Sequence, residues 1–417
     1  MYEEQDLDLD TIGKTQKNKN IVKIVVIVSV LAVLVIVALL FYSLYSGGGE
    51  NENSELISGT SSEAASQLSE EASSLDASES SDEEASGEIE ASESSVSDES
   101  EVSEEISEEP EHGWVINAMG YTYLYQGKGY NQFNGTKAIA EKYSDALSNF
   151  MAKVSFPVYS MVAPTAVEFV DIPYDVKQAD DFYNSSQKTF ISAVEGALGS
   201  SAIDIYGSIS EKVKDEYLYL RTDKNWTADA AYLAYLDFCE KTGNIPASKT
   251  GYELGSYTGY LGNFYNATGS EKLKANADVV NYYKINAVFP CSVTMYNGNL
   301  AYKDRALIYT QLSNPVSYGY YAFLGDRGET FTITSQNSAT EKSILVVGDS
   351  AAFAFVPYLV ANYRNVYFIN AEAYNGNVSE YLADKSVDEG VVLSYASDAA
   401  STSYIKRLEK LFAVSEG

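Results

Sequence analysis

Asp223, Lys224 and Asn225 lie together in the stretch LRTDKNWTADAAY (residues 220–232), where polar side chains could carry out chemistry. The apolar run YLYL before them predicts a short strand, and the residues from Trp226 onward have helical spacing. Strand-to-helix corners of this kind commonly hold an acid next to a histidine base. The single histidine of the chain lies elsewhere, so this corner offers an acid, an amine and an amide instead.

A second corner, ILVVGDSAAFAF (residues 344–355), places Ser350 directly after a buried strand and at the start of a helix. Ligands of open α/β sheets bind at the carboxyl ends of the strands. A helix N-terminus can stabilise a developing oxyanion there, and Gly348 allows a tight exit from the strand. Ser350 is therefore a candidate nucleophile for acyl transfer. The alternative is that Asp349 or Ser350 merely caps the helix.

The elements that would position these corners alternate along residues 113–417. Helices are expected over 138–152, 179–198, 226–242, 353–363 and 378–384, with a closing helix up to Phe412. Strands are expected from Val154, at 202–206, at 217–220 and in the runs SILVVGDS, NVYFIN and EGVVLSY. Continuous apolar strands between helices predict an α/β fold with a parallel sheet covered on both faces. Residues 251–335 are less regular and predict insertion or edge-strand material.

Residues 24–46 form an apolar run without a charge, IVVIVSVLAVLVIVALLFYSLYS. It is long enough to cross a hydrocarbon core of about 30 Å, which favours an uncleaved transmembrane helix. Lysines precede the run and acids follow it, so the positive-inside rule predicts that residues 1–23 are a cytoplasmic tail. The C-terminal part would then lie outside the cell membrane.

Residues 47–112 contain 22 Asp and Glu, no Lys or Arg, and no aromatic residue. Such a stretch cannot bury enough apolar surface to fold, and it predicts a disordered linker. Most of the net charge of −31 lies in this linker. The remainder is only mildly acidic and has no basic stripe, so we expect no nucleic-acid partner.

Two cysteines, Cys239 and Cys291, are too few for a disulfide scaffold. They could bridge in an oxidising space, or remain buried thiols that act as small apolar side chains. We expect neither a metal site nor a cofactor.

Three motifs together resemble the bacterial DHHW protein family. They are TDKNWTADAAYLAY from Thr222, YLGNFY at residues 260–265, and LVVGDS followed by VPYL. The similarity covers nearly all of residues 115–410 in order and spacing. It implies an SGNH-like, flavodoxin-like fold related to alginate O-acetyltransferase-like domains. Members of this wider group resemble enzymes that move or remove acyl groups on envelope polysaccharides.

The family's loop reads T-D-x-H-W, in which the aspartate orients a histidine that serves as base for the serine of G-D-S. Thr222, Asp223, Trp226 and Ser350 match this pattern, but Asn225 stands in the place of the histidine. The family's basic residue is also absent from INAEAY, residues 369–374. By the same resemblance, Gly262 and Asn263 are candidate oxyanion donors.

The absent base decides between two functions. A positioned base contributes about 10²–10⁴ in rate, and an amide cannot accept a proton near neutral pH. His112 lies at the end of the linker, and Lys224 could substitute only if it lost its proton. We therefore expect a catalytically degenerate domain that acts in the cell envelope by glycan binding or scaffolding. The alternative is an O-acyl esterase or O-acetyltransferase that acts on cell-wall or capsule polysaccharide through Ser350.

The tyrosine content supports the glycan hypothesis. Several of the 35 tyrosines cluster at residues 120–130, 251–265 and 317–323, among Gly and Asn residues. Aromatic faces beside amides suit stacking on sugar rings, although each tyrosine alone could equally be a core or rim residue with a solvated hydroxyl.

Overall fold

The structure is a computed structural model that describes residues 111–117 and 120–413. The predicted cytoplasmic tail, the transmembrane segment at 24–46 and almost all of the linker lie outside the described residues. Within the described part of the chain, no helix combines the length and the apolar character needed to cross a membrane.

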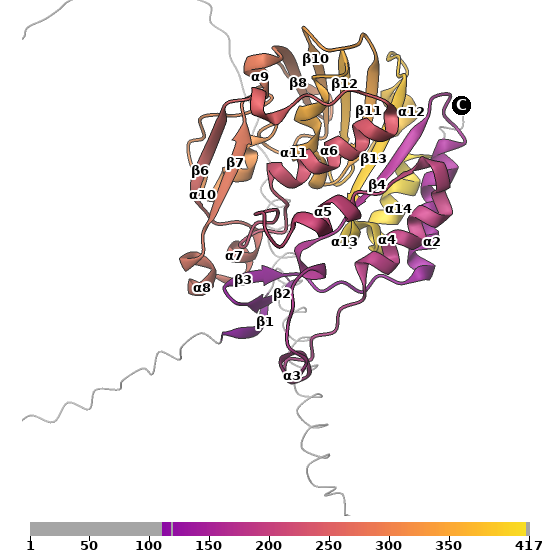
Figure 1. Ribbon diagram of the computed structural model, residues 1–417. Helices are drawn as coiled ribbons and strands as arrows, with labels where there is room; N and C mark the ends of the chain where they lie inside the picture. Colours follow the sequence, from indigo (N-terminus) through magenta and orange to yellow (C-terminus); the bar gives the residue numbers. More distant parts are fainter. Residues whose placement is uncertain (1–110, 118–119, 414–417) are drawn as a thin grey trace, which may run out of the picture. The chain divides into compact units, whose positions relative to one another are not determined.

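A central eight-stranded sheet organises the described part (Figure 1). Its first five strands in spatial order are parallel, and the last three form an antiparallel edge. The order is β5 (Ala202–Ile203), β4 (Val158–Ala163), β13 (Glu389–Tyr395), β11 (Ser343–Gly348), β12 (Asn365–Asn370), β10 (Thr330–Ser335), β8 (Cys291–Asn297) and β9 (Leu300–Tyr302). This confirms the predicted α/β class, but the sheet is parallel only from β5 to β12 rather than throughout.

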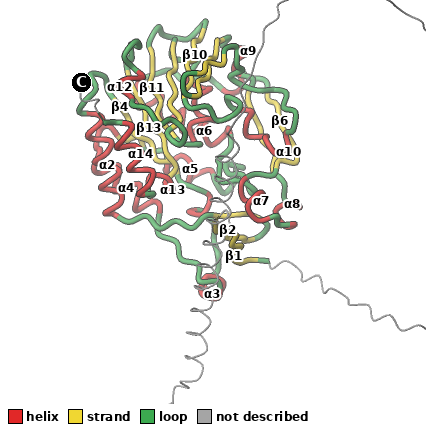
Figure 2. Tube along the Cα trace, turned by 180° about the vertical axis from the view of Figure 1, so that it is seen from behind, coloured by secondary structure: helices red, strands yellow, loops and turns green. Residues whose placement is uncertain are grey.

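Helices cover both faces of this sheet (Figures 1 and 2). Successive side chains of β11 point to opposite faces, so Ile344 and Val346 join one apolar cluster and Leu345 and Val347 join the other. The first cluster includes α6 (Ala228–Thr242) and α11 (Ala351–Leu359). The second includes α2 (Lys137–Met151), α4 (Gln187–Leu198) and α14 (Thr402–Leu411).

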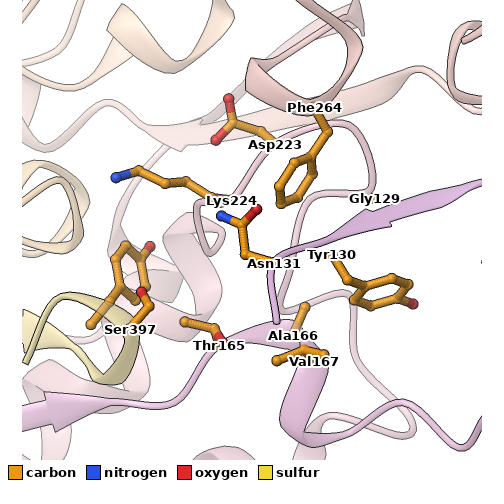
Figure 3. Close-up of a pocket in the computed structure, with 11 residues that line it drawn as sticks. Gly129, Tyr130, Asn131, Thr165, Ala166, Val167, Asp223, Lys224, Phe264 and Ser397 are labelled. Atoms are coloured by element: carbon orange, nitrogen blue, oxygen red, sulfur yellow. The ribbon is translucent and has the colours of Figure 1, made fainter. Parts of the chain in front are cut away.

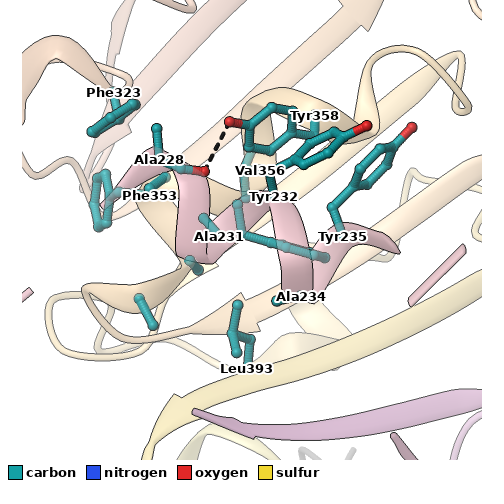
Figure 4. Packing of buried hydrophobic residues seen from close by; sticks show 14 of the residues in the cluster. Ala228, Ala231, Tyr232, Ala234, Tyr235, Phe323, Phe353, Val356, Tyr358 and Leu393 are labelled. Carbon is teal, nitrogen blue, oxygen red and sulfur yellow. Dashed lines mark hydrogen bonds between the residues drawn. The ribbon is translucent and has the colours of Figure 1, made fainter. Parts of the chain in front are cut away.

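The contact between α6 and α11 joins the first turn of α6 to the C-terminal end of α11. Tyr232 and Tyr235 of α6 pack on Tyr358 of α11, with ring centroids 5.3 and 5.5 Å apart (Figure 4). The Tyr358 hydroxyl donates to the Ala228 carbonyl oxygen in the first turn of α6 (3.0 Å). Because the corners that contain Asn225 and Ser350 run directly into these helices, this packing positions both of them.

Smaller sheets lie beside the central one. The first contains β1 (His112–Asn117), β2 (Gly120–Tyr125) and β3 (Lys128–Tyr130), and the second pairs β6 (Leu254–Tyr260) with β7 (Asp278–Tyr283). The Gly129 N–H of β3 donates to the Arg221 carbonyl oxygen (2.8 Å), which ties the first small sheet to the corner before Asp223. The shorter helices are α3 (Tyr174–Ala179), α5 (Tyr206–Lys212), α7 (Asn263–Thr268), α8 (Glu271–Ala275), α9 (Ile285–Val288), α10 (Pro315–Tyr318), α12 (Val378–Tyr381) and α13 (Ala396–Ala399).

Two predicted elements were wrong. Residues 217–220 form no strand, because only Tyr219 pairs, through an isolated bridge to Trp226. The helix predicted over 179–198 begins only at Gln187 (α4), because α3 ends at Ala179 and Asp181 has a left-handed φ of 56° that interrupts a helix. The helix predicted from Trp226 begins at Ala228, with Thr227 as its N-cap.

Candidate functional site

The two corners predicted from the sequence meet at the carboxyl ends of the central strands. Trp226 Nε1 donates to the Ala351 carbonyl oxygen (3.1 Å), and the Trp226 backbone N–H donates to the Tyr395 hydroxyl (2.8 Å). The Tyr395 N–H donates in turn to Asp349 Oδ2 (2.7 Å). Trp226, which is fully buried, therefore joins the corner of Asn225 to the corner of Ser350 and to the end of β13.

Thr222 anchors the first corner. Its hydroxyl and its N–H donate to Asp278 Oδ2 of β7 (2.5 and 2.8 Å), and the hydroxyl accepts the Gly262 N–H (2.9 Å). Asp278 is fully buried and also accepts the Arg221 N–H (2.7 Å). These bonds satisfy the buried carboxylate and fix the backbone immediately before Asp223.

Asp223 is surrounded by donors. Its Oδ1 accepts from the Asn225 side-chain amide (2.7 Å) and the Asn225 N–H (2.9 Å). Its Oδ2 accepts from the Tyr260 hydroxyl (2.7 Å) and the Asn263 N–H (3.0 Å). Burial, together with the charge and hydrogen bond of Asp223, raises the pKa of Tyr260 far above its ordinary value, so Tyr260 remains a donor. Asp223 thus has the fully bonded environment of an orienting acid.

The Asn225 side chain makes the hydrogen bond to Asp223 that an oriented base would make. Its Nδ2 donates to Asp223, as an imidazole N–H does when an aspartate orients a histidine. Its Oδ1 is buried and has no hydrogen-bond partner among the described residues. A primary amide cannot take a proton from a hydroxyl near neutral pH, so the Asn225 side chain cannot itself serve as a base.

Ser350 is fully buried at the N-terminus of α11. Its Oγ has no hydrogen-bond partner within the described part of the chain and is bonded to neither Asp223 nor Asn225. Helix capping, the alternative role predicted for this corner, applies to Asp349, whose Oδ1 accepts the Ala351 N–H (2.8 Å). Ser350 makes no capping bond. Gly348 is required by space, because an added Cβ would lie 2.6 Å from the Leu393 carbonyl oxygen.

Lys224 belongs to a charged cluster beside this corner. Its Nζ lies 3.3 Å from Glu372 Oε1 and 4.0 Å from Asp398 Oδ2, and Arg327 contacts the other oxygen of Glu372 (3.4 Å). Burial disfavours the charged amine, but Asp398, Glu372 and Asp349 outweigh it and raise the pKa of Lys224. Lys224 therefore keeps its proton and does not suit the role of substitute base.

Glu372 and Asp398 were not predicted from the sequence. Both follow the carboxyl ends of strands, in INAE after β12 and in SYASD after β13, and that position was the available signal. Burial and neighbouring acids raise the pKa of Asp349 well above its ordinary value, and the pKa of Asp398 is raised as well. Ionisation of these two carboxyls is therefore less favourable than that of exposed acids.

The proposed oxyanion donors are already engaged. The Gly262 N–H bonds Thr222, and the Asn263 N–H bonds Asp223. When its nitrogen faces the carboxylate, the Asn263 side-chain amide also reaches Asp223, at 2.5 and 3.2 Å. A Cβ at position 262 would lie 2.3 Å from the Cβ of Asp223. These two residues therefore support the acid rather than present free N–H groups.

A small cavity opens beside the cluster (Figure 3). Asp223 and Lys224 line it together with Phe264, Tyr395 and residues of the neighbouring segments, namely Gly129, Tyr130, Asn131, Thr165, Ala166, Val167 and Ser397. Ser350, Asn225 and Gly348 do not line it. The cavity therefore reaches the acid and the amine but not the serine hydroxyl.

His112 lies in β1 rather than in the linker, and its Nδ1 is 2.6 Å from Asp180 Oδ2. Asp180 also accepts the Tyr123 hydroxyl (2.7 Å), so the histidine is held within the small sheet. Among residues 111–117 and 120–413, no three His, Cys, Asp or Glu residues are grouped as metal ligands. Cys239 and Cys291 are both free thiols.

Fold and site define a mixed α/β domain with a Gly-Asp-Ser corner and an acid–amide corner at the carboxyl ends of its central strands. Residues 67–369 match the DHHW protein family, and the chain belongs to this family. No curated protein matches the chain.

Solved structures share the fold. A DHHW family protein from Eubacterium siraeum superposes with a TM-score of 0.61 at 21% identity, covering 73% of this chain and 100% of that chain. Bacillus cereus PatB1 superposes with a TM-score of 0.54 at 16% identity, covering 70% of this chain and 99% of that chain. PatB1 with a sulfonyl adduct gives the same score and identity, covering 68% and 98%. At these identities the likeness concerns the fold alone.

Proposed function

We propose that the C-terminal part of the chain is an extracytoplasmic, SGNH-like domain that binds glycan in the cell envelope and has lost acyl-transfer catalysis. Residues 24–46 would anchor it in the cell membrane with the N-terminus in the cytoplasm, and residues 47–112 would tether it at a distance. The envelope polysaccharide is its proposed partner.

The Asn225 side chain carries the proposal. It makes the hydrogen bond to Asp223 that an oriented histidine would make, at 2.7 Å, but it cannot accept a proton. Loss of one member disables a catalytic unit whose members act together. The buried and unpartnered Ser350 hydroxyl and the protonated Lys224 leave no activated nucleophile at this corner.

Retention on cell-wall polymer tests the glycan function. Full-length protein in detergent should co-sediment with insoluble cell-wall polysaccharide, and free polysaccharide should release it. Failure to co-sediment would reject glycan binding and would favour a scaffolding role.

An O-acyl esterase or O-acetyltransferase that uses Ser350 is the second candidate function. It is favoured by the position of Ser350, at the carboxyl end of β11 and at a helix N-terminus. Hydrolysis of an aryl acetate by the full-length protein, abolished by Ser350→Ala, would establish this candidate and overturn the degenerate one. We expect wild type and Ser350→Ala to be equally inactive.

A further inference from the structure

A groove on the first small sheet is independent of the Ser350 corner. It is lined by Trp114 and Ile116 of β1 and Tyr121 of β2, by three amide side chains after β3, and by Asp181. The β1–β2 register pairs Trp114 with Tyr123 and Ile116 with Tyr121, so these four side chains lie on one face of the sheet. This face therefore presents a row of apolar and aromatic side chains.

Trp114 in this row is held by packing and a hydrogen bond, whereas Tyr121 and Ile116 are exposed to solvent. Trp114 packs on Tyr123 and Phe182, with ring centroids 5.3 and 5.7 Å apart, and its Nε1 donates to the Asp180 carbonyl oxygen (2.8 Å). Tyr121 and Ile116 are 67% and 65% exposed. Adjacent exposed apolar side chains on a fixed support are typical of binding surfaces.

The amide side chains of the groove are Asn131, Gln132 and Asn134, and Gln132 Nε2 already donates to the Tyr183 carbonyl oxygen. Amides offer both donors and acceptors, which is what a sugar hydroxyl or acetamido group requires. Asn131 lines both this groove and the cavity that contains Asp223 and Lys224, and Figure 3 shows its amide facing that cavity. One residue thus links the aromatic face to the site at the central sheet.

The charge of the groove favours an uncharged ligand over an anionic one. Among the residues that the structure describes, no lysine, arginine or histidine lines this groove, and Asp181 is the one charged residue that does. An anionic polymer would find no counter-charge there, whereas an uncharged pyranose can stack on the ring faces and bond the amides.

We propose that the groove of Trp114, Ile116, Tyr121, Asn131, Gln132 and Asn134 binds an uncharged pyranose chain that extends toward the cavity at Lys224. This inference rests on the proposed glycan function and assigns it a surface and a sugar class.

The test uses the full-length protein in detergent and calorimetric titration with two uncharged tetrasaccharides, chitotetraose and cellotetraose. Tetragalacturonate is the anionic counterpart. We expect at least one uncharged ligand to bind and tetragalacturonate to bind at least about tenfold more weakly. Tyr121→Ala should weaken the uncharged ligand by about tenfold, the loss of one stacked ring. Tyr302→Ala, an exposed tyrosine on edge strand β9, is the matched control and should stay within about twofold.

If Tyr121→Ala leaves the affinity for an uncharged tetrasaccharide unchanged, the groove is not the binding site. Tighter binding of tetragalacturonate than of the uncharged ligands would also overturn the proposed site. Retention on cell-wall polymer without binding of either uncharged ligand would also overturn the groove, while the proposed function would stand. Absence of retention and of binding would overturn both.

Discussion

At the scale of single residues, a histidine at position 225 would both bond Asp223 and act as a base, whereas Asn225 can do only the first. Its Nδ2 preserves the bond to Asp223, so the corner keeps its shape, whereas its Oδ1 cannot act as a base. The acid keeps its other donors, Tyr260 and Asn263. The proposed loss of catalysis at this position therefore leaves the local fold intact.

Asn225→His should restore part of that function. An imidazole can donate to Asp223 from one nitrogen and present the other as a base, which is worth about 10²–10⁴ in rate. We expect measurable aryl acetate hydrolysis by Asn225→His that Asn225→His/Ser350→Ala lacks. A variant that folds as wild type does but stays inactive would argue against an altered acyl-transfer site.

Lys224 should act as a structural cation. Replacing it by methionine leaves Glu372 and Asp398 without their nearest amine and should lower the free energy of unfolding by about 1–3 kcal/mol. Urea denaturation measures the change, with the exposed Lys214→Met as control. Equal stability of Lys224→Met and wild type would contradict this role.

At the scale of elements, the sequence predicted the strands best where apolar residues run continuously. SILVVG, NVYFIN and EGVVLSY are β11, β12 and β13, because strands covered on both faces bury almost every side chain. The run YLYL looked similar but finds no partner strand, and propensity alone does not supply one. Asp181 interrupted a predicted helix through a backbone conformation that its residue type does not reveal.

The candidate site was predictable where its residues follow an apolar run in the sequence. Asp223, Asn225 and Ser350 were found because they follow strand-like runs, and Trp226 and Tyr395 do bring their corners together. The position of Glu372 after β12 was a signal, but its ion pairs with Lys224 and Arg327 were not predictable, since they join three segments that only the folded sheet brings together.

Helix α4 carries a titratable group that should make stability depend on pH. Burial, with Asp204 adding to it, raises the pKa of Glu195 from 4.5 to about 7. The folded state then binds this proton more tightly than the unfolded state, so Glu195 lowers stability as pH rises from 4.5 toward 7. Glu195→Gln should match wild type below pH 4.5 and have a higher Tm above pH 7.

Thermal unfolding at both pH values checks this, with the exposed Glu211→Gln as control. A Tm difference between Glu195→Gln and wild type that does not change with pH would refute the assignment.

At the scale of the whole molecule, the anchor, tether and external location remain predictions from the sequence. Residues 47–112 contain 22 acids and no Lys or Arg, so a glutamate-specific protease should cut there and trypsin should not. Added to intact protoplasts, the glutamate-specific protease should release a fragment that contains the described domain. Protection of the chain until the cells are lysed would place this part in the cytoplasm instead.

The Ser350 hydroxyl is proposed to be unactivated, because its neighbouring corner carries an amide where a base is needed. Sulfonyl fluorides form covalent adducts with activated hydroxyls, and intact-protein mass spectrometry after incubation with phenylmethylsulfonyl fluoride measures this directly. We predict no mass increase for wild type and a Ser350-dependent increase for Asn225→His. A stoichiometric adduct on Ser350 of the wild-type protein would contradict the claim.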